Sequence, residues 1–167
     1  MDVQLDAKDI EILDLIQDNC KQTVKELARK IHSPITTVYN KIKRMEKHGV
    51  IKGYKAILDH KKLGLTTTAF IFISFSYEYG NNARSQREVV KKIAQLPEVQ
   101  EAHIVTGDWD IILKVRVRDV NELGRFVIDK LRVIEGVERT LTSVVLDTSK
   151  ESTRIPIKLI FKDKFRK

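Results

Sequence analysis

Apolar residues recur at helical spacing three times in the N-terminal third of the chain. Positions three and four residues apart lie on one side of an α-helix, so each run predicts a helix with one buried face. We expect the first helix from after Asp6 to about Asp18, the second from Thr23, and the third from Pro34 to about His48. The expected inward-facing residues are Ile10, Leu13, Ile16, Leu27, Ala28, Ile31, Val38, Ile42 and Met45.

Capping signals mark the ends of these helices. Thr23 and Glu26 have the spacing of a capping box, in which each side chain accepts a hydrogen bond from the other residue's backbone N–H. Pro34 suits the first helical position because no N–H is needed there, which makes Ser33 the predicted cap of the third helix. Gly49 is placed to end that helix in a left-handed conformation. Two helices joined by so short a turn predict a helix-turn-helix.

Beyond Gly49 the apolar positions follow a different pattern. Residues 50–58 alternate around Gly53, which predicts two short strands, a wing. Strands are then expected over 67–77, 99–106, 110–117 and 137–147, and helices over 83–96 and 120–134. The order βαββαβ is typical of the ferredoxin-like arrangement. The sequence thus predicts an α+β fold with a winged helix-turn-helix domain at 1–58, a linker at 59–66, a βαββαβ domain at 67–150 and a basic extension at 151–167.

The first strand of the βαββαβ domain carries apolar side chains on both faces. Phe70 and Phe72 alternate with Ile71 and Ile73. Two helices would cover one face of the sheet, and the other face needs a different cover. A second copy of the chain is the simplest cover, so we expect a homodimer.

Most of the excess positive charge lies in one block of the chain. The net charge is +8, and residues 20–62 carry twelve Lys or Arg against three acidic residues. Residues 1–19 are acidic, residues 63–150 are balanced, and residues 151–167 are basic. A basic block beside a neutral one indicates a polyanionic partner, although a solvated basic surface would give the same composition.

The C-terminal extension has an alternating pattern of its own. Ile155, Ile157, Leu159 and Phe161 alternate with mostly polar residues. This pattern favours an added strand at a contact between subunits. A flexible tail is an equally good interpretation, because chain ends are often disordered.

The third helix has a polar and basic outer side, which favours double-stranded DNA as the partner. Asn40 has the hydrogen-bonding groups to pair with adenine, and Arg44 those to pair with guanine or phosphate. Lys43 and Lys47 suit phosphates. Any one of these residues taken alone is equally well a solvated surface residue. The candidate DNA-binding residues are Ser33, Thr36, Thr37, Tyr39, Asn40, Lys41, Lys43, Arg44 and Lys47.

Other classes of function find little support in the residues. Cys20 is the only cysteine, and the four histidines show no metal-ligand spacing. No apolar run reaches the roughly 18 residues of a membrane helix, and the acidic N-terminus does not look like a signal peptide. No paired acids or Cys–His couple indicate catalysis. We therefore expect a cytoplasmic protein that is not an enzyme and has no metal, cofactor or membrane partner.

Both halves of the sequence together resemble the Lrp/AsnC (feast/famine) family of prokaryotic transcription regulators. The resemblance covers about residues 5–150. In the N-terminal half it rests on LDAKDIEILDLIQDN, ELARKI and TTVYNKIKRMEKHGVIKGYKAILD, and in the C-terminal half on VQEAHIVTGDWDIILKVRVRDVNELGRF and IEGVERTLTSVVL. It implies a RAM-type C-terminal domain that pairs into homodimers and often octamers, promoter binding by the N-terminal domains, and a small effector, usually an amino acid.

In this family the effector lies near the GxxD turn, which corresponds to Gly107–Asp110 here. Gly107 permits a tight turn whose N–H groups can hold a carboxylate, and Asp108 or Asp110 can pair with an ammonium group. From the residues alone, a plain hairpin in which Asp110 caps local amides is the simpler interpretation. The candidate effector-binding residues are His103, Thr106, Gly107, Asp108, Trp109, Asp110, Thr140, Thr142 and Ser143.

Two departures from the family pattern lie in the helix-turn-helix. The turn is His32-Ser33-Pro34, where the family usually has a glycine, and Lys41 replaces the usual arginine of the third helix. Lysine lacks the bidentate fork of arginine, so a guanine contact there would be weaker or would become a phosphate contact. The competing functions are an amino-acid-binding assembly protein that does not bind DNA and an enzyme like the haem-pathway decarboxylases that resemble this family.

Overall fold

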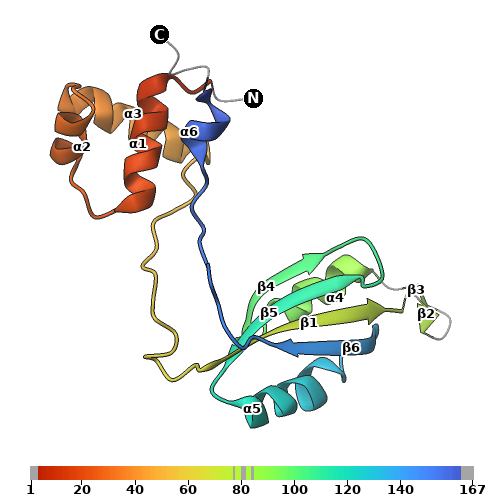
Figure 1. Cartoon of the computed structure of the whole chain (residues 1–167). Coiled ribbons are helices and arrows are strands. Elements are labelled where there is room, and N and C mark those ends of the chain that lie inside the picture. The colour runs from red at the N-terminus through yellow and green to blue at the C-terminus, as the bar shows by residue number, and fades with distance from the viewer. Residues whose placement is uncertain (1–3, 77, 80–81, 84, 163–167) are drawn as a thin grey trace. The chain divides into compact units, whose positions relative to one another are not determined.

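The computed structural model describes residues 4–76, 78–79, 82–83 and 85–162, which form two compact units (Figure 1). The first, here called the N-terminal unit, combines Met1–Ile57 with Lys150–Lys167. The second, here called the sheet unit, is Leu58–Ser149. No helix among the described residues is both long and apolar enough to cross a membrane.

The N-terminal unit contains α1 (Ala7–Asp18), α2 (Val24–Lys30), α3 (Ile35–Lys47) and the short α6 (Ile157–Ile160). The capping box of α2 is confirmed: the backbone N–H of Glu26 donates to Thr23 Oγ1 at 3.2 Å, and that of Thr23 donates to Glu26 Oε2 at 2.7 Å. Asp6 and Asp9 form a second capping box at the start of α1. Each box satisfies N–H groups that have no partner inside the helix.

The start of α3 differs from the prediction. Ser33 was the expected cap, but the helix begins at Ile35, and Pro34 occupies the cap position without a side-chain hydrogen bond. The reason is the extended backbone of Pro34, whose ψ of 143° delays the first helical residue by one. The other end agrees with the prediction, because Gly49 has a left-handed φ of 71° after the helix.

The predicted wing strands are wrong. Within residues 51–58, all of which are described, the chain forms no strand, and the side chains of Ile57 and Leu58 are exposed. A strand needs a hydrogen-bonded neighbour, and alternation along the sequence cannot supply one. The described residues of the N-terminal unit therefore contain no β-strand.

The sheet unit confirms the βαββαβ order. Its four-stranded antiparallel sheet has the order β4-β5-β1-β6, with β1 and β5 in the centre. The elements are β1 (Thr67–Phe75), α4 (Gln86–Ile93), β4 (Val99–Ile104), β5 (Ile111–Val117), α5 (Val120–Arg125), the π-helix η1 (Phe126–Leu131) and β6 (Val137–Val144). A small hairpin of β2 (Glu78–Tyr79) and β3 (Asn82–Ala83) follows β1 and was not expected.

Two helix boundaries in this unit also differ from the expected ones. The helix expected from residue 83 begins at Gln86, because Ala83 belongs to the β2–β3 hairpin. The helix expected over 120–134 changes to π-helical hydrogen bonding at Phe126 and ends at Leu131. Tyr77, expected at the end of the first strand, lies outside the described residues.

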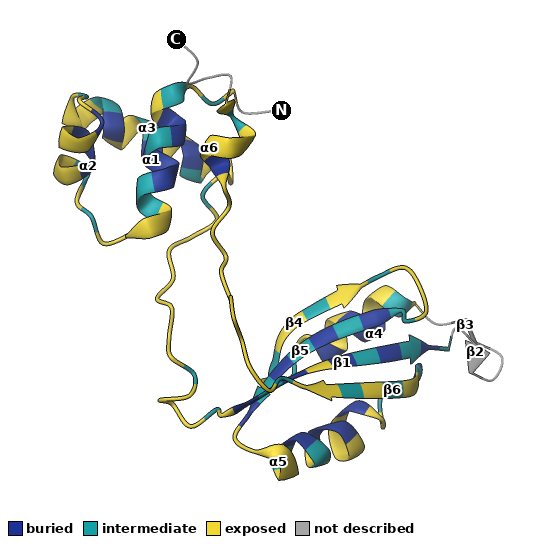
Figure 2. Ribbon diagram, viewed as in Figure 1, coloured by how far each residue is buried: buried dark blue, intermediate teal, exposed yellow. Residues whose placement is uncertain are grey.

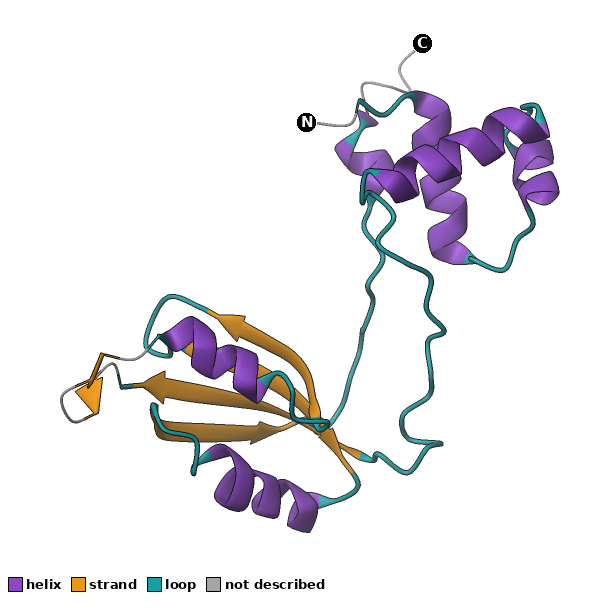
Figure 3. Ribbon diagram, turned by 180° about the vertical axis from the view of Figure 1, so that it is seen from behind, coloured by secondary structure: helices purple, strands orange, loops and turns teal. Residues whose placement is uncertain are grey.

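The helices lie on one face of the sheet (Figure 3). Ile71, Ile73 and Phe75 point to that side and are buried, as the alternating colours along β1 show in Figure 2. The opposite face, here called the open face, carries Phe70 and Phe72. The strand register extends this face across the sheet to Ile112 on β5 and Leu141 on β6.

The C-terminal extension follows neither interpretation drawn from its alternating pattern. Residues 157–160 form α6, which packs against α1 (Figure 1). Ile157 joins the apolar core of the N-terminal unit, together with residues of α1, α2 and α3. The extension is therefore an additional piece of the N-terminal unit, and residues 163–167 lie outside the described part of the chain.

Candidate DNA-binding surface and effector region

One side of α3 is buried and the other is exposed to solvent. Val38, Ile42 and Met45 face the core, as predicted from their spacing. The exposed side carries Thr36, Tyr39, Asn40, Lys43 and Lys47. Thr37, half-buried, lies at the edge of this surface, and Ser33 lies in the preceding turn, where its Oγ accepts a hydrogen bond from Lys8 at 2.6 Å.

Lys41 lies away from the exposed side of α3. Its ammonium group pairs with Asp6 and, at 3.1 Å, with Asp9, and only 15% of its side chain is exposed. Burial alone would lower the pKa of Lys41, but the hydrogen bonds to the two carboxylates outweigh it and raise that pKa. Burial alone would raise the pKa of Asp6, but the hydrogen bonds from Lys41 and from the backbone N–H of Asp9 outweigh it and lower that pKa. The charge of Lys41 is thus neutralised inside the unit.

Asp9 is the centre of this ion-pair cluster. It is fully buried, and its carboxylate also accepts a hydrogen bond from Arg44 at 2.5 Å. The Arg44 side chain is 42% exposed, so it joins the buried carboxylate to the surface. A buried charge is tolerated only when it is paired, and here two basic residues of α3 pair with one residue of α1. Asp9 therefore fixes the position of α3 on α1.

Lys43 is held beside the exposed side of α3 by local contacts. Its ammonium group lies 2.9 Å from Glu46 and 5.8 Å from the centre of the Tyr39 ring. The hydroxyl of Tyr54 donates to Glu46 at 3.0 Å. Burial and this hydrogen bond raise the pKa of Tyr54 to about 12, so Tyr54 stays a neutral donor. Tyr54 thus helps to orient the carboxylate that faces Lys43.

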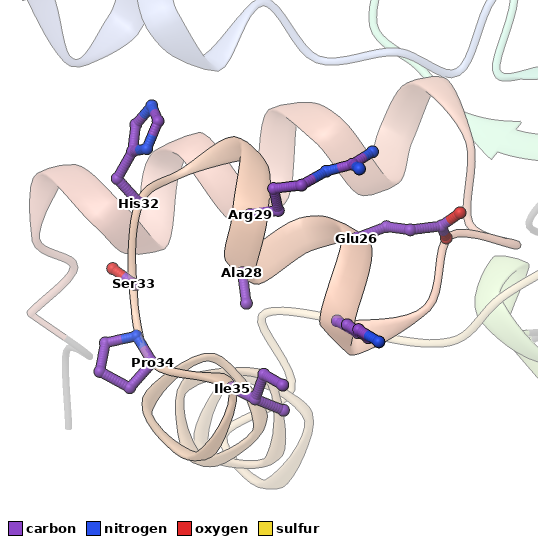
Figure 4. Close-up of a pocket in the computed structure, with 8 residues that line it drawn as sticks. Glu26, Ala28, Arg29, His32, Ser33, Pro34 and Ile35 are labelled. Atoms are coloured by element: carbon purple, nitrogen blue, oxygen red, sulfur yellow. The ribbon is translucent and has the colours of Figure 1, made fainter.

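A hollow of about 770 Å³ lies between α2 and the start of α3 (Figure 4). Lys25, Arg29 and His32 contribute basic groups to its lining, and Ala28 and Pro34 contribute apolar atoms. The sequence prediction missed this region. The available signal was the spacing of Lys25 and Arg29, which places both on the same exposed side of α2. Its cationic groups widen the basic surface beyond α3.

In the effector region, Asp110 has a structural role. Its Oδ2 accepts a hydrogen bond from the backbone N–H of Phe75 at 2.8 Å, and its own N–H donates to Ile73 O at 3.0 Å. The simpler interpretation, in which Asp110 caps local amides, describes these contacts. Gly107 has a φ of 118°, which few other residues adopt, and Thr106 and Asp108 are exposed in the same loop.

Trp109 packs on the open face. Its ring lies 6.2 Å from that of Phe72, and the Arg139 guanidinium lies 5.0 Å from its centre. His103 is also on this face, because it pairs across the sheet with Ile112. The ring of His103 lies 3.4 Å from the Glu101 carboxylate.

The last strand divides the predicted effector residues between the two faces of the sheet. Thr140 and Thr142 pair with Ile73 and Ile71, which face the helices. Thr140 Oγ1 accepts a hydrogen bond from Arg132 at 3.0 Å. Ser143 pairs with Phe70 and lies on the open face. Within one chain, Ser143 therefore lies on the open face together with His103 and Trp109. Thr140 and Thr142 lie on the opposite face, which the helices cover.

Family comparisons cover both units of the chain. Residues 5–52 match a winged helix-turn-helix DNA-binding model, and residues 68–155 match the Lrp/AsnC ligand binding domain. An HTH-type transcriptional regulator of Pyrococcus abyssi is 43% identical over 147 residues, which cover 88% of this chain and 96% of the relative. The HTH-type transcriptional regulator FL11 of Pyrococcus horikoshii is 35% identical, with 95% and 100% covered.

Solved structures give the same result. A Neisseria meningitidis transcriptional regulator in complex with L-Met is 29% identical, with a TM-score of 0.87 over 95% of this chain and 100% of that one. The AsnC protein of E. coli is 27% identical, with a TM-score of 0.81 over 91% and 99%. With the polar outer side of α3 and the order of the four strands, these matches establish that the chain belongs to the Lrp/AsnC family of transcriptional regulators, with a DNA-binding helix-turn-helix followed by the ligand-binding domain of that family.

Proposed function

We propose that this regulator binds specific double-stranded DNA as a homodimer in the cytoplasm and that an amino acid adjusts this binding. The observation that carries the DNA part is the exposed side of α3, which presents amide, hydroxyl and ammonium groups on a helix whose position is fixed by Asp9. These are the groups that contact base edges and phosphates in a major groove. In this proposal α3 is the recognition helix.

The contacts divide by side chain. Asn40 and Thr36 contact bases, because their short polar groups lie on the exposed side. Lys43 and Lys47 contact phosphates of the DNA. Lys25 and Arg29, which line the hollow, contact further phosphates along the same DNA backbone. Lys41 acts as a positioning residue, because Asp6 and Asp9 already hold its ammonium group. Arg44 remains a candidate for a phosphate through its exposed part.

Titration of a duplex from the promoter of its own gene, with the protected site located by footprinting, tests the DNA part. Asn40→Ala removes a base contact, so affinity for that site should fall by about 1–3 kcal/mol while affinity for unrelated DNA stays the same. Lys47→Gln removes a phosphate contact and should weaken binding to both DNAs. The control is Lys62→Gln, an exposed lysine of the sheet unit. Equal affinities of wild type and Asn40→Ala for the protected site would refute the base contact.

The amino-acid part rests on the matched ligand-binding domain and on the Neisseria relative, which was solved with L-Met. An α-amino acid needs a partner for its carboxylate and one for its ammonium group. The Gly107 turn offers backbone N–H groups for the carboxylate. Asp108 is the better partner for the ammonium group, because its side chain is exposed. The carboxylate of Asp110 already accepts a hydrogen bond from the backbone N–H of Phe75.

Calorimetric titration with each of the twenty amino acids tests this part. Asp108→Asn should weaken the binding of any amino acid that is found, because the ammonium group loses its counter-charge. Asp147→Asn, a change of another exposed acid in the same unit, is the control. An affinity for the amino acid that is unchanged in Asp108→Asn would rule out this role for Asp108.

A further inference from the structure

The last described residues of the chain are attached to α1 by a specific set of contacts. Ile157 is 8% exposed and lies in the core of the N-terminal unit, and Phe161 packs against the same core. The side-chain amide of Gln17 pairs with the backbone of Ile155: Nε2 donates to the carbonyl at 3.2 Å, and Oε1 accepts from the N–H at 2.8 Å. This segment is therefore held through its backbone as well as through an apolar anchor.

Charged groups complete the attachment. Arg154 lies 2.7 Å from Asp14 and 3.0 Å from Asp18, and Lys158 lies 2.6 Å from Asp14. The Asp14 side chain is only 10% exposed. The hydrogen bond from Lys158 is the largest influence on Asp14 and, with that from Arg154, lowers its pKa in spite of burial. The acidic N-terminal residues and the basic extension noted in the sequence thus meet on α1.

The attached segment is the direct continuation of β6. The sheet ladder extends one residue past β6, where Val145 N–H donates to Thr68 O at 2.9 Å. Residues 146–154 then form neither helix nor strand, and their side chains are exposed. The chain between the last strand and α1 is therefore a short connection with a fixed point at each end.

The helix α1 holds the recognition helix as well as the C-terminal segment. Near its first turn, Asp9 pairs with Lys41 and Arg44 of α3. In its C-terminal half, Asp14, Gln17 and Asp18 hold the C-terminal segment. A displacement of the segment would therefore act on the same helix that positions α3.

We propose that residues 145–161 are a mechanical link that carries a movement of β6 to α1 and, through Asp9, to the recognition helix. The inference rests on the proposed function, because it assigns to this segment the transmission of the amino-acid signal. The segment linking Ile57 to β1 already joins the two units, so the second connection is not needed to hold them together. Residues 145–161 follow β6 directly and are held on α1 by polar contacts, so a movement of β6 would be passed to α1.

Three variants separate transmission from simple packing. A slack variant carries about ten inserted Gly and Ser residues between Thr148 and Ser149, which adds roughly 17 Å of flexible reach and leaves every attachment contact intact. An undocked variant combines Asp14→Asn with Ile157→Ser. The control is Lys162→Gln, which removes a positive charge of the extension from a side chain that is exposed. Hydrogen exchange of residues 157–161 reports attachment, and operator titration with and without each amino acid reports the response.

We expect the backbone amides of residues 157–161 to be as protected from hydrogen exchange in the slack variant and the control as in wild type. In the undocked variant this protection should be lost. Without amino acid, the slack variant should bind the operator like wild type. Allosteric effectors typically change affinity about fivefold or more, and this change should fall below about twofold in the slack variant and persist in the control.

A slack variant with the full amino-acid response would overturn the link, and so would an undocked variant that has lost the protection of residues 157–161 yet still responds to the amino acid like wild type. If wild type does not bind the operator, or binds it without any amino-acid response, the proposed function itself fails and the link fails with it. If wild type responds and the slack variant responds just as strongly, the proposed function stands and the link alone is refuted.

Discussion

The carboxylate of Asp9 joins the first turn of α1 to two basic side chains of the recognition helix. It is fully buried, and it combines a capping role with ion pairs to Lys41 and Arg44. Removing one partner of a buried ion pair is costly, because the groups left behind cannot recover their hydration. The residue thus links a local capping motif to the position of a helix that is distant in sequence.

Asp9→Asn should lower the free energy of unfolding by about 3 kcal/mol, since Lys41 keeps its ion pair with Asp6 while Arg44 loses the carboxylate with which it pairs in the described part of the chain. Urea unfolding followed by circular dichroism measures this loss. Asp59→Asn, which changes an exposed acid with one weak ion pair, should cost less than about 1 kcal/mol. Equal midpoints for the two variants would contradict the role of Asp9.

The spacing of apolar residues predicts which side of α3 faces outward. It does not predict which residues of other helices contact α3. Val38, Ile42 and Met45 were predicted as core residues and are buried. The ion pairs of Lys41 depend on Asp6 and Asp9, more than thirty positions away. A single sequence does not show such a contact. His32 is similar: its left-handed φ of 50° in the turn explains why the family usually has a glycine there, but only the backbone reveals it.

At the scale of elements, the predictions that succeeded depend on neighbours in the sequence. The capping box of α2 and the βαββαβ order of the elements along the chain both follow from local patterns of residue types. The prediction of a wing failed because a strand requires a neighbouring strand to which it can form hydrogen bonds. The helix α6 was missed because its four residues are too few to be stable alone and depend on contacts such as Arg154–Asp14, which are 140 residues apart.

The attachment of α6 should respond to acid but not to pH changes near neutrality. Because the pKa of Asp14 is lowered below its ordinary value of 3.8, its stabilising charge is present above that pH and is lost as pH falls through the lowered value. Amide chemical shifts of Ile157–Ile160 should therefore stay constant from pH 8 to about pH 5 and change only below pH 3.8. Asp14→Asn should abolish this acid transition, whereas a transition near pH 6 would point to a different group.

At the scale of the whole molecule, the open face of the sheet unit predicts self-association. Phe70 is 37% exposed and Leu141 is 48% exposed in the single chain. Apolar side chains gathered on one face indicate a protein interface. An introduced charge would have to be buried in a homodimer that forms through this face.

Leu141→Glu should therefore keep the proposed homodimer from forming at micromolar concentrations, because an unpaired carboxylate is costly to bury. Light scattering after size-exclusion chromatography measures the mass against the 19.3 kDa of one chain. Val133→Glu changes an exposed apolar residue after η1 and should leave the dimer intact. A dimeric Leu141→Glu variant would place the interface elsewhere.

The internal pairing of basic side chains has a consequence for how the protein meets a polyelectrolyte. Lys41, Arg44, Arg154 and Lys158 belong to the basic stretches of the sequence, yet each is matched by a carboxylate of α1 or of its cap residue. Each phosphate that a protein neutralises releases condensed counterions, and the logarithm of the affinity falls by about 0.9 per decade of salt for each such phosphate. Counterion release from the operator should therefore reflect Lys47, Lys25 and Arg29, together with Lys43, whose pair with Glu46 lies on the surface. It should be smaller than the formal charge of the N-terminal unit suggests.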